Sequence, residues 1–300
     1  MSVGEDPRPG RPSTSTNDDH VERVGDVIRG NHCLTVREVA DEVGFSIGSC
    51  HQIFTEKLQM CRISAKFMPR LLTDDQKENH VEISQELLAN DNGNENFLKN
   101  IITGDQTWVY GYYVETRMQS SQWMGERSPR PKKGQMSQSK IKVLLVVFFD
   151  WKDIVHHEFV PHDQMVNKQL YQEVLVRLRD TVHRKRPEMW ENETWMLHHK
   201  NALAHASLLI RSYLAKQKTS IVPHPPYSPD LAPADLFLFP KLKTTLKERC
   251  FQTREQIQEN AIRELRAIIE RVFKDAFQQW KKCWEWCIAS RGNYFEGDTA

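Results

Sequence analysis

The chain has 300 residues, of which 39% are hydrophobic and 9% aromatic, so it can bury a sizeable core, which argues against wholesale disorder. Its 41 Lys and Arg residues nearly balance 40 Asp and Glu residues, so at a net charge of +1 any affinity for nucleic acid must come from local clusters. The longest apolar run, residues 143–149, is far shorter than the roughly 20 residues of a membrane span, and the first residues show no secretion signal, so we expect no membrane partner.

Residues 1–19 are predicted to form a flexible linker arm that is rich in Arg and Pro. Arg8 lies close to the run Gly10-Arg11-Pro12. An extended arm with Arg8 and Arg11 suits the narrow minor groove of DNA, where the negative potential is strongest. A disordered terminus without a partner is the alternative interpretation of this segment.

Residues 20–60 are predicted to form a small all-α domain that contains a helix-turn-helix. Thr35 and Glu38 have the spacing of a capping box, Gly44 is expected to end that helix, and Ser46 can cap the next one. In a helix-turn-helix, the last helix enters the major groove with polar side chains near its start. The candidate DNA-binding residues of this domain are Ser46, Ser49, His51, Gln52 and Lys57. An ordinary helical hairpin is the alternative.

Residues 61–98 are predicted to be a helical connector, and residues 99–300 a larger α/β domain. In the larger domain, the residue patterns predict elements at 101–113 (strand), 141–149 (strand), 154–160 (strand), 167–184 (helix), 194–198 (strand), 202–216 (helix), 220–222 (strand) and 253–288 (a last long helix). Three antiparallel strands followed by alternating helices and strands describe a layered α/β sheet. A ribonuclease-H-like fold has this order of elements.

Two acidic residues and one basic loop stand out in the larger domain. Asp105 lies at the start of the first strand and Asp235 opens a helix, so each taken singly has a structural interpretation as a turn residue or a helix cap. Residues 115–142 contain seven Lys and Arg residues against two Glu residues. Such a loop can contact phosphates without reading bases, although a solvated hairpin loop is the alternative. Its candidate DNA-binding residues are Arg130, Lys132 and Lys133.

The last predicted helix carries aromatic residues at helical spacing. Phe273, Phe277, Trp280 and Trp284 fall on one face, which predicts packing against the sheet in preference to a platform that stacks single-stranded bases. The six cysteines of the chain include no Cys-x-x-Cys pair, and we therefore expect reduced thiols.

Three motifs of the chain resemble those of the mariner family of DNA transposases. Residues 227–235, Tyr-Ser-Pro-Asp-Leu-Ala-Pro-Ala-Asp, resemble the signature that ends in the third acid of the family. Residues 103–105, Thr-Gly-Asp, resemble its first acidic motif, and residues 201–205, Asn-Ala-Leu-Ala-His, resemble the end of the motif that supplies the second acid. The resemblance covers residues 8–298. It implies a helix-turn-helix domain followed by a ribonuclease-H-like DDE/D catalytic domain, double-stranded DNA as partner and the nucleus as location.

The resemblance also implies a metal site, from which this chain departs. In the family, three aspartates hold two divalent ions, Mg²⁺ or Mn²⁺, that drive DNA strand cleavage and transfer. The resemblance assigns catalytic and metal-binding roles to Asp105 and Asp235 as the first and third acids. The family spacing places the second acid at position 200, where this chain has Lys200. Because an ammonium repels divalent ions, we expect impaired metal binding and loss of cleavage.

Three functional hypotheses follow from the sequence. The one that we favour is a mariner-type, transposase-derived DNA-binding protein that has lost cleavage. The alternatives are an active metal-dependent transposase or endonuclease that cuts transposon-end DNA despite Lys200, and a non-functional relic. The chain begins almost at the linker that follows the first of two helix-turn-helix modules in the family, so we expect an N-terminally truncated copy. Residues 67–72 match the dimer-contact element of the family only in part, which leaves homodimer formation open.

Overall fold

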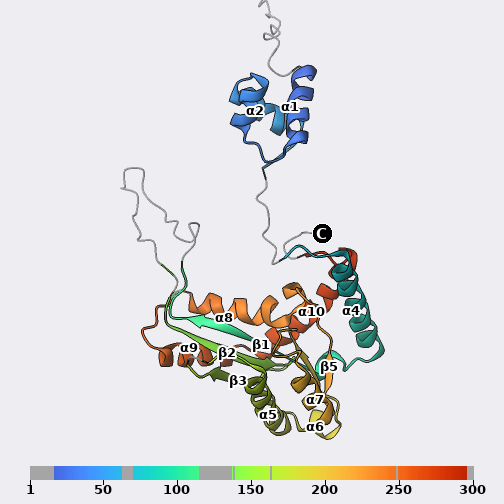
Figure 1. Ribbon diagram of the computed structural model, residues 1–300, viewed down its shortest axis with the longest axis vertical. Coiled ribbons are helices and arrows are strands. Elements are labelled where there is room, and N and C mark those ends of the chain that lie inside the picture. The colour runs from blue at the N-terminus through green and yellow to red at the C-terminus, as the bar shows by residue number, and fades with distance from the viewer. Residues whose placement is uncertain are drawn as a thin grey trace, which may run out of the picture. The chain divides into compact units, whose positions relative to one another are not determined.

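The computed structural model describes residues 17–62, 70–114, 137, 139–162, 164–247 and 249–295. The chain divides into two compact units, Met1–Phe67 and Met68–Ala300, which are described separately (Figure 1). In these described ranges, no helix combines the length and the apolar character that crossing a membrane requires.

The first unit is a bundle of short helices. They are α1 (Asp18–Gly30), α2 (Val36–Val43), α3 (Ile47–Gln52) and the π-helical turn η2 (Ile53–Lys57) that continues α3. The predicted capping box of Thr35 and Glu38 is confirmed at the start of α2, and Gly44 ends this helix with a φ of 74°. Ser46 caps α3, because its side chain accepts a hydrogen bond from the backbone N–H of Ser49. A tight turn therefore separates α2 from α3.

A small apolar core holds these helices together. Each helix contributes from one face, and the buried residues are Val24, Ile28, Val39, Ala40, Val43, Cys50 and Ile53. The polar side chains of α3 consequently lie on the outside of the unit, where they are open to a partner.

The second unit is built on one five-stranded sheet. Its strands are β1 (Ile101–Tyr110), β2 (Lys142–Phe149), β3 (Ile154–Val160), β4 (Met196–His199) and β5 (Ser220–Val222), in the order β3-β2-β1-β4-β5. β2 pairs antiparallel with β1 and β3, whereas β4 runs parallel to β1 and β5. This arrangement confirms the α/β class predicted from the order of the elements.

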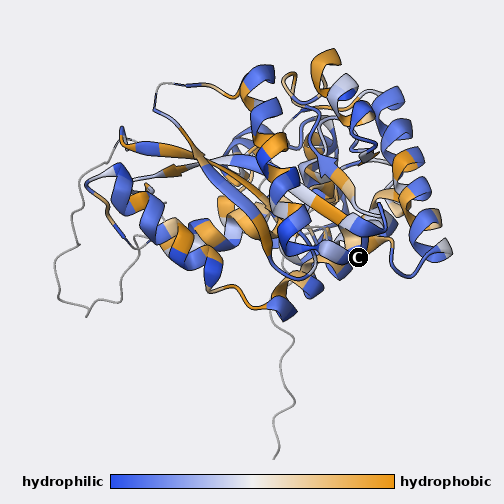
Figure 2. Cartoon of the chain, turned by 90° about the horizontal axis from the view of Figure 1, so that it is seen from below, coloured by the Kyte–Doolittle hydropathy of each residue, from blue (hydrophilic) through white to orange (hydrophobic). Residues whose placement is uncertain are grey.

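Helices cover both faces of the sheet (Figures 1 and 2). One face carries α5 (Lys168–Lys185) and α7 (Leu208–Lys216), and the other carries α8 (Phe239–Leu246), α9 (Arg254–Arg266) and α10 (Glu270–Ala289), on which α4 (Asp74–Gly93) packs. Successive residues of β2 alternate between the two cores, which is why residues 143–149 are apolar throughout. The short helical segments are η3 (Leu98–Asn100), α6 (Pro187–Glu191), η4 (Pro229–Leu231) and η5 (Ala234–Leu238).

Three segments differ from the sequence-based expectation. The helix predicted at 202–216 starts only at Leu208, where α7 begins. The single helix predicted at 253–288 is wrong, because α9 ends at Arg266 and α10 starts at Glu270. A straight helix of that length would extend about 54 Å and leave the sheet, whereas the break turns the apolar faces of both helices onto one core. Within the connector predicted at 61–98, α4 lies in the second unit and packs along α10.

The aromatic face of the last helix is confirmed, since Phe273, Phe277, Trp280 and Trp284 are all buried. The six cysteines have free thiols. The aromatic side chains of α10 therefore belong to the core of the second unit and offer no stacking surface.

Gly104 of β1 provides a direct test of the sheet packing. Gly104 pairs with Phe148 of β2, and a Cβ atom at position 104 would overlap the Phe148 ring. We expect Gly104→Ala to lower the free energy of unfolding by about 1–3 kcal/mol, measured by urea denaturation. The matched control is Gly93→Ala in α4, where an added Cβ meets nothing within 4 Å. Equal unfolding midpoints for the two variants would contradict the packing described.

Candidate functional site

Asp105 forms the buried part of the candidate site. It is the fifth residue of β1, and its side chain is 5% exposed. Because side chains alternate along a strand, Asp105 shares a face with Thr103 and points toward the layer that contains η5 and α10. Gly104 lets the ring of Phe148 approach the other face of the strand closely.

Asp235 is held opposite Asp105 by a compact turn. The segment after β5 forms η4 and then η5, in which Asp235 is the second residue. The indole of Trp280 donates a hydrogen bond of 2.8 Å to the carbonyl of Leu231, which fixes this turn to α10. Tyr227 at the start of the turn has a φ of 57°, an uncommon conformation for a residue that is not glycine.

Lys200 follows the last residue of β4 and lies between the two carboxylates. Its Nζ atom is 2.7 Å from Oδ2 of Asp105 and also forms an ion pair with Asp235. The parallel pairing of β1 and β4 explains this meeting, because it brings the residue after β4 beside the centre of β1. The three side chains predicted to converge therefore do converge. They form an ion-paired group, which we call the acidic site.

Charge and burial act against each other in the acidic site. Burial opposes the charge of Lys200, but Asp105 and Asp235 outweigh it, so the pKa of the Lys200 ammonium is raised above its ordinary value. Burial raises the pKa of Asp105, against the opposing effect of Lys200. The nearby Lys243 of α8 has a lowered pKa because of burial. A protonated Lys200 is thus the state that the surroundings stabilise.

The acidic site does not fit a pair of divalent ions. Mg²⁺ and Mn²⁺ require several oxygen ligands, and here two carboxylates face an ammonium that donates where the ion needs an acceptor. Within the part of the chain that the structure describes, no three His, Cys, Asp or Glu side chains are grouped closely enough to hold a metal ion. Among the described side chains, no other acid takes the place of Lys200 in this group.

A chain of buried imidazoles lies beside the acidic site. Nδ1 of His198 is hydrogen-bonded to the hydroxyl of Thr103 at 2.8 Å, and Nε2 of His198 lies 3.3 Å from Nδ1 of His224. His224 in turn lies 3.4 Å from the Ser228 hydroxyl through its Nε2. These contacts connect β1, β4 and the turn that carries Asp235. They hold the three elements of the acidic site in register.

His205 supports the backbone of Lys200 from the other side. Its Nδ1 donates to the carbonyl of Lys200 at 3.1 Å, and its Nε2 lies 3.1 Å from the side-chain amide of Gln106. The ring of His205 stacks on Tyr171, with the ring centroids 3.9 Å apart. The sequence motif contained His205, but no sequence signal linked Tyr171 or His224 to the site, because they lie on segments that the motifs do not include.

The candidate DNA-binding residues of the first unit lie on or beside α3. Ser46 and Ser49 bond to each other through their hydroxyls at 2.9 Å, and Gln52 donates to Glu56 at 2.9 Å. His51, Gln52 and Lys57 are exposed. These residues therefore lie along one segment of the first unit, with His51, Gln52 and Lys57 open to solvent. Five other candidates, Arg8, Arg11, Arg130, Lys132 and Lys133, lie outside the described residues.

Comparisons with known proteins bear on both units. A family described as a transposase with a partial DDE domain matches residues 113–192. Over 98% of this chain, the human histone-lysine N-methyltransferase SETMAR is 26% identical, and over 77% of it the mariner Mos1 transposase of Drosophila mauritiana is 27% identical. The chain spans 42% and 66% of the lengths of these two relatives, less than two thirds in each case.

Solved structures share the fold. The Mos1 mariner paired-end complex with Mn has a TM-score of 0.85 at 24% identity, with 97% of this chain and 83% of that chain covered. The catalytic domain of the Mos1 mariner transposase has a TM-score of 0.64 at 26% identity and covers 77% of this chain and 100% of that chain. The ribonuclease-H-like, DDE-type fold expected for the second unit is thereby confirmed.

The buried imidazoles predict a specific dependence of stability on pH. Burial lowers the pKa of His199 and His224 to about 3 and that of His205 to about 4, from 6.5. Below pH 6.5 the unfolded chain binds protons at these residues while the folded chain does not. We therefore expect the free energy of unfolding, measured by urea denaturation, to fall between pH 6.5 and 5, with a slope for each such imidazole that rises toward about 1.4 kcal/mol per pH unit at the lower end.

The variant His205→Gln serves as the control for this prediction. Gln retains a donor for the carbonyl of Lys200 but does not titrate. The slope of the unfolding free energy against pH should therefore decrease by the contribution of about one proton. If the slopes of parent and variant are the same in this window, His205 binds protons equally in the folded and the unfolded chain and the prediction is wrong.

Proposed function

The chain belongs to the mariner family of transposases, and we propose that it is a DNA-binding member of this family in which metal-dependent strand cleavage is lost. The observation that carries the proposal is the pair of contacts from Lys200 to Asp105 and Asp235. The spacing of the family motifs assigns position 200 to the second acid, and the geometry supports this assignment because Lys200 lies between the other two acids.

The ion pairs make cleavage unfavourable for an electrostatic reason. A site with three carboxylates carries a charge of about −3 and attracts two divalent ions that activate and stabilise oxygens during strand cleavage. With Lys200 protonated, the charge of the ionised group is about −1, and the ammonium lies where an ion would have to bind. Asp105 and Asp235 can hold Lys200, but they cannot also supply the ligands for two metals.

Duplex DNA is the proposed partner of the first unit. The support is the exposed outer surface of α3 with His51, Gln52 and Lys57, and the tight turn between α2 and α3. This geometry suits a helix-turn-helix whose last helix enters the major groove. Related solved structures include a Mos1 transposase paired-end complex with a left transposon end, which favours transposon-derived DNA as the target.

We also propose that the protein assembles on DNA and is located in the nucleus. The Mos1 structures are described as paired-end complexes, and we extend from them the proposal that two copies of this chain associate on DNA. Binding to chromosomal DNA would place the protein in the nucleus.

The variant Lys200→Asp tests the proposed loss of metal binding. Three carboxylates should attract Mn²⁺, so at a Mn²⁺ concentration of 100 times Kd the ion should stabilise the variant by about 2.7 kcal/mol, seen as a rise in Tm. The parent should show neither this rise nor heat of specific binding in calorimetry. We also expect Mn²⁺-dependent nicking of terminal-repeat DNA by the variant and none by the parent.

The matched control is Lys200→Asn, which removes the ammonium without adding a carboxylate. It should bind Mn²⁺ far more weakly than Lys200→Asp and should not nick DNA. Robust Mn²⁺-dependent nicking by the parent would refute the proposed loss of cleavage.

DNA binding by α3 has a separate test. Fluorescence anisotropy with a terminal-repeat duplex should show an affinity that falls steeply with salt concentration. Lys57→Gln should reduce the slope of log K against log salt by about 0.9 if Lys57 contacts one phosphate, whereas Gln52→Ala should reduce discrimination between sequences and leave the slope unchanged. Lys216→Gln, at an exposed position of α7, is the control for removal of one charge. No binding of the parent to any duplex at low salt would exclude the DNA-binding function.

A further inference from the structure

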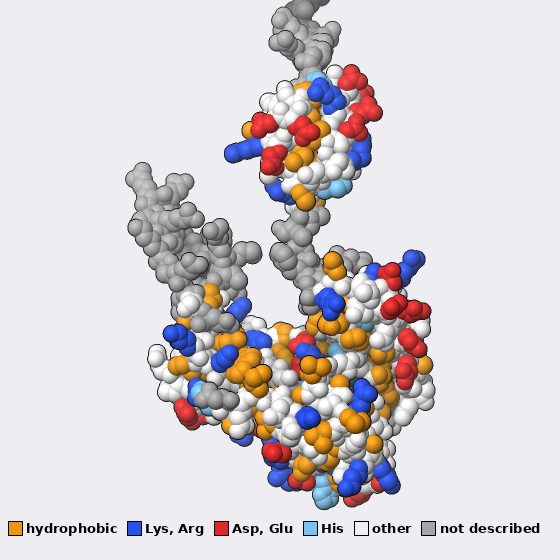
Figure 3. Space-filling view, viewed as in Figure 1, with side chains coloured by type: hydrophobic (Ala, Val, Ile, Leu, Met, Phe, Trp, Pro, Cys, Tyr) orange, Lys and Arg blue, Asp and Glu red, His pale blue; other side chains and the backbone are white. Residues whose placement is uncertain are grey.

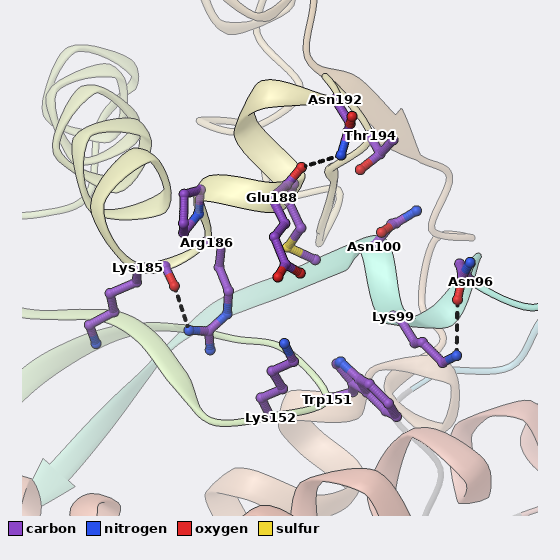
Figure 4. A pocket seen from close by; sticks show the side chains of 12 residues that line it. Asn96, Lys99, Asn100, Trp151, Lys152, Lys185, Arg186, Glu188, Asn192 and Thr194 are labelled. Carbon is purple, nitrogen blue, oxygen red and sulfur yellow. Dashed lines mark hydrogen bonds between the residues drawn. The ribbon is translucent and has the colours of Figure 1, made fainter.

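A cleft lies at the end of the sheet where β1 and β4 begin (Figure 4). Its volume is about 500 Å³. Three parts of the chain form its walls: η3 with the residues before it, the turn from β2 to β3, and the segment from the end of α5 to Thr194. Thr194 lines the cleft and is six residues before Lys200. An extended segment of six residues spans about 20 Å, so the cleft is separate from the acidic site.

Cations dominate the charged side chains of the cleft. Lys99, Lys152, Lys185 and Arg186 line it, whereas Glu188 is the single carboxylate among the residues that line it. The remaining polar lining consists of neutral groups, namely Asn96, Asn100, Asn192 and Thr194. This set of side chains offers many hydrogen-bond donors and excess positive charge, which favours an anionic ligand and disfavours a metal ion.

The four cations differ in whether a protein group already neutralises or accepts a hydrogen bond from them. Arg186 is paired with the buried Asp150 at 2.6 Å and with Asp153 at 2.7 Å, so it is a fixed part of the wall. The ammonium of Lys185 donates to the carbonyl of Ile154 at 2.9 Å. Lys152, in the exposed turn, carries no ion pair among the described side chains. Its charge is therefore available to a ligand.

Two neighbouring hollows extend this basic surface. One shares Lys99 and Trp151 with the cleft and adds Lys274 and Lys281, each of which already has an acidic partner, Glu270 and Asp91. The other shares Lys185 and adds Arg266. Acidic residues line these hollows too, but two of them are neutralised in the ion pairs Asp91–Lys281 and Asp153–Arg186. In the view of Figure 3, Lys and Arg side chains gather at the lower edge of the second unit, over α5 and α6, with some carboxylates among them.

We propose that this cleft and its two neighbouring hollows form a second DNA-binding surface that holds the phosphate backbone of a duplex. Separate lysines act as point charges and suit successive phosphates better than they suit one small anion. The indole of Trp151 already has the ammonium groups of Lys99 and Lys274 at 5.3 and 5.0 Å from its ring centre, which leaves it a poor platform for a stacked base. A duplex, whose bases stay paired, requires no such platform.

The experiment compares two pairs of charge removals in the full chain. The double variant Lys99→Gln with Lys152→Gln removes two charges from the cleft. The control, Lys216→Gln with Lys282→Gln, removes two exposed charges that line none of these hollows. Anisotropy with a random-sequence duplex is measured between 50 and 200 mM salt.

We expect the slope of log K against log salt to be less steep by about 1.8 in the cleft variant than in the parent. The control should have the slope of the parent. Across this fourfold salt range, the affinity of the parent should then fall about 12 times further than that of the cleft variant. Equal slopes for the parent and the cleft variant would overturn the proposal. The variant Lys57→Gln separates this outcome from a failure of α3, because it should reduce the slope by about 0.9 wherever α3 contacts a phosphate, whether or not the cleft binds DNA.

A second measurement requires no variant. With a saturating duplex bound, Lys152 should be protected from chemical acetylation while Lys216 is modified as before, as detected by mass spectrometry. Acetylation of Lys152 at the same rate with and without the duplex would overturn the proposal. Protection of Lys152 by adenosine monophosphate but not by the duplex would also overturn it, because it would identify the cleft as a site for a free nucleotide.

Discussion

The ion pairs of Lys200 with Asp105 and Asp235 are the interaction on which the interpretation of this protein depends. Three residues that are distant in the sequence meet because β1 and β4 are parallel neighbours and the turn with η5 folds over them. Two carboxylates brought close together in a partly buried place repel each other unless a cation lies between them. In a metal-dependent site, that cation is the divalent ion. In this chain, Lys200 supplies the charge from the protein itself.

The loss of cleavage that we propose is compatible with an intact fold, because Lys200 balances the two carboxylates in place of a metal ion. The elements around the acidic site retain a dense set of contacts, among them the imidazoles of His198 and His224 and the hydrogen bond from Trp280 to the turn. A bare cluster of three carboxylates would weaken these contacts by repulsion in the absence of metal. With Lys200 in place, the charges are largely balanced without a ligand, and the site becomes a structural ion pair.

A balanced net charge conceals an uneven distribution of charge over the second unit. The acidic site lies beside the end of β4, whereas the lysines of the cleft surround the start of β1 and β4. Separation along the sheet keeps the phosphate-binding surface that we propose apart from the carboxylates that would repel it. The net charge of +1 therefore does not describe how the protein would interact with a polyanion.

The sequence by itself determined the local features and the identity of the residue at position 200. Thr35, Gly44 and Ser46 set helix ends through contacts within a few residues, and the spacing between motifs alone singles out position 200. Only the tertiary structure decided the ion pairs, the imidazole chain, the break before α10 and the cleft. These features join segments as much as 130 residues apart, such as Asp105 with Asp235, and depend on strand pairing and packing that no short stretch of sequence encodes.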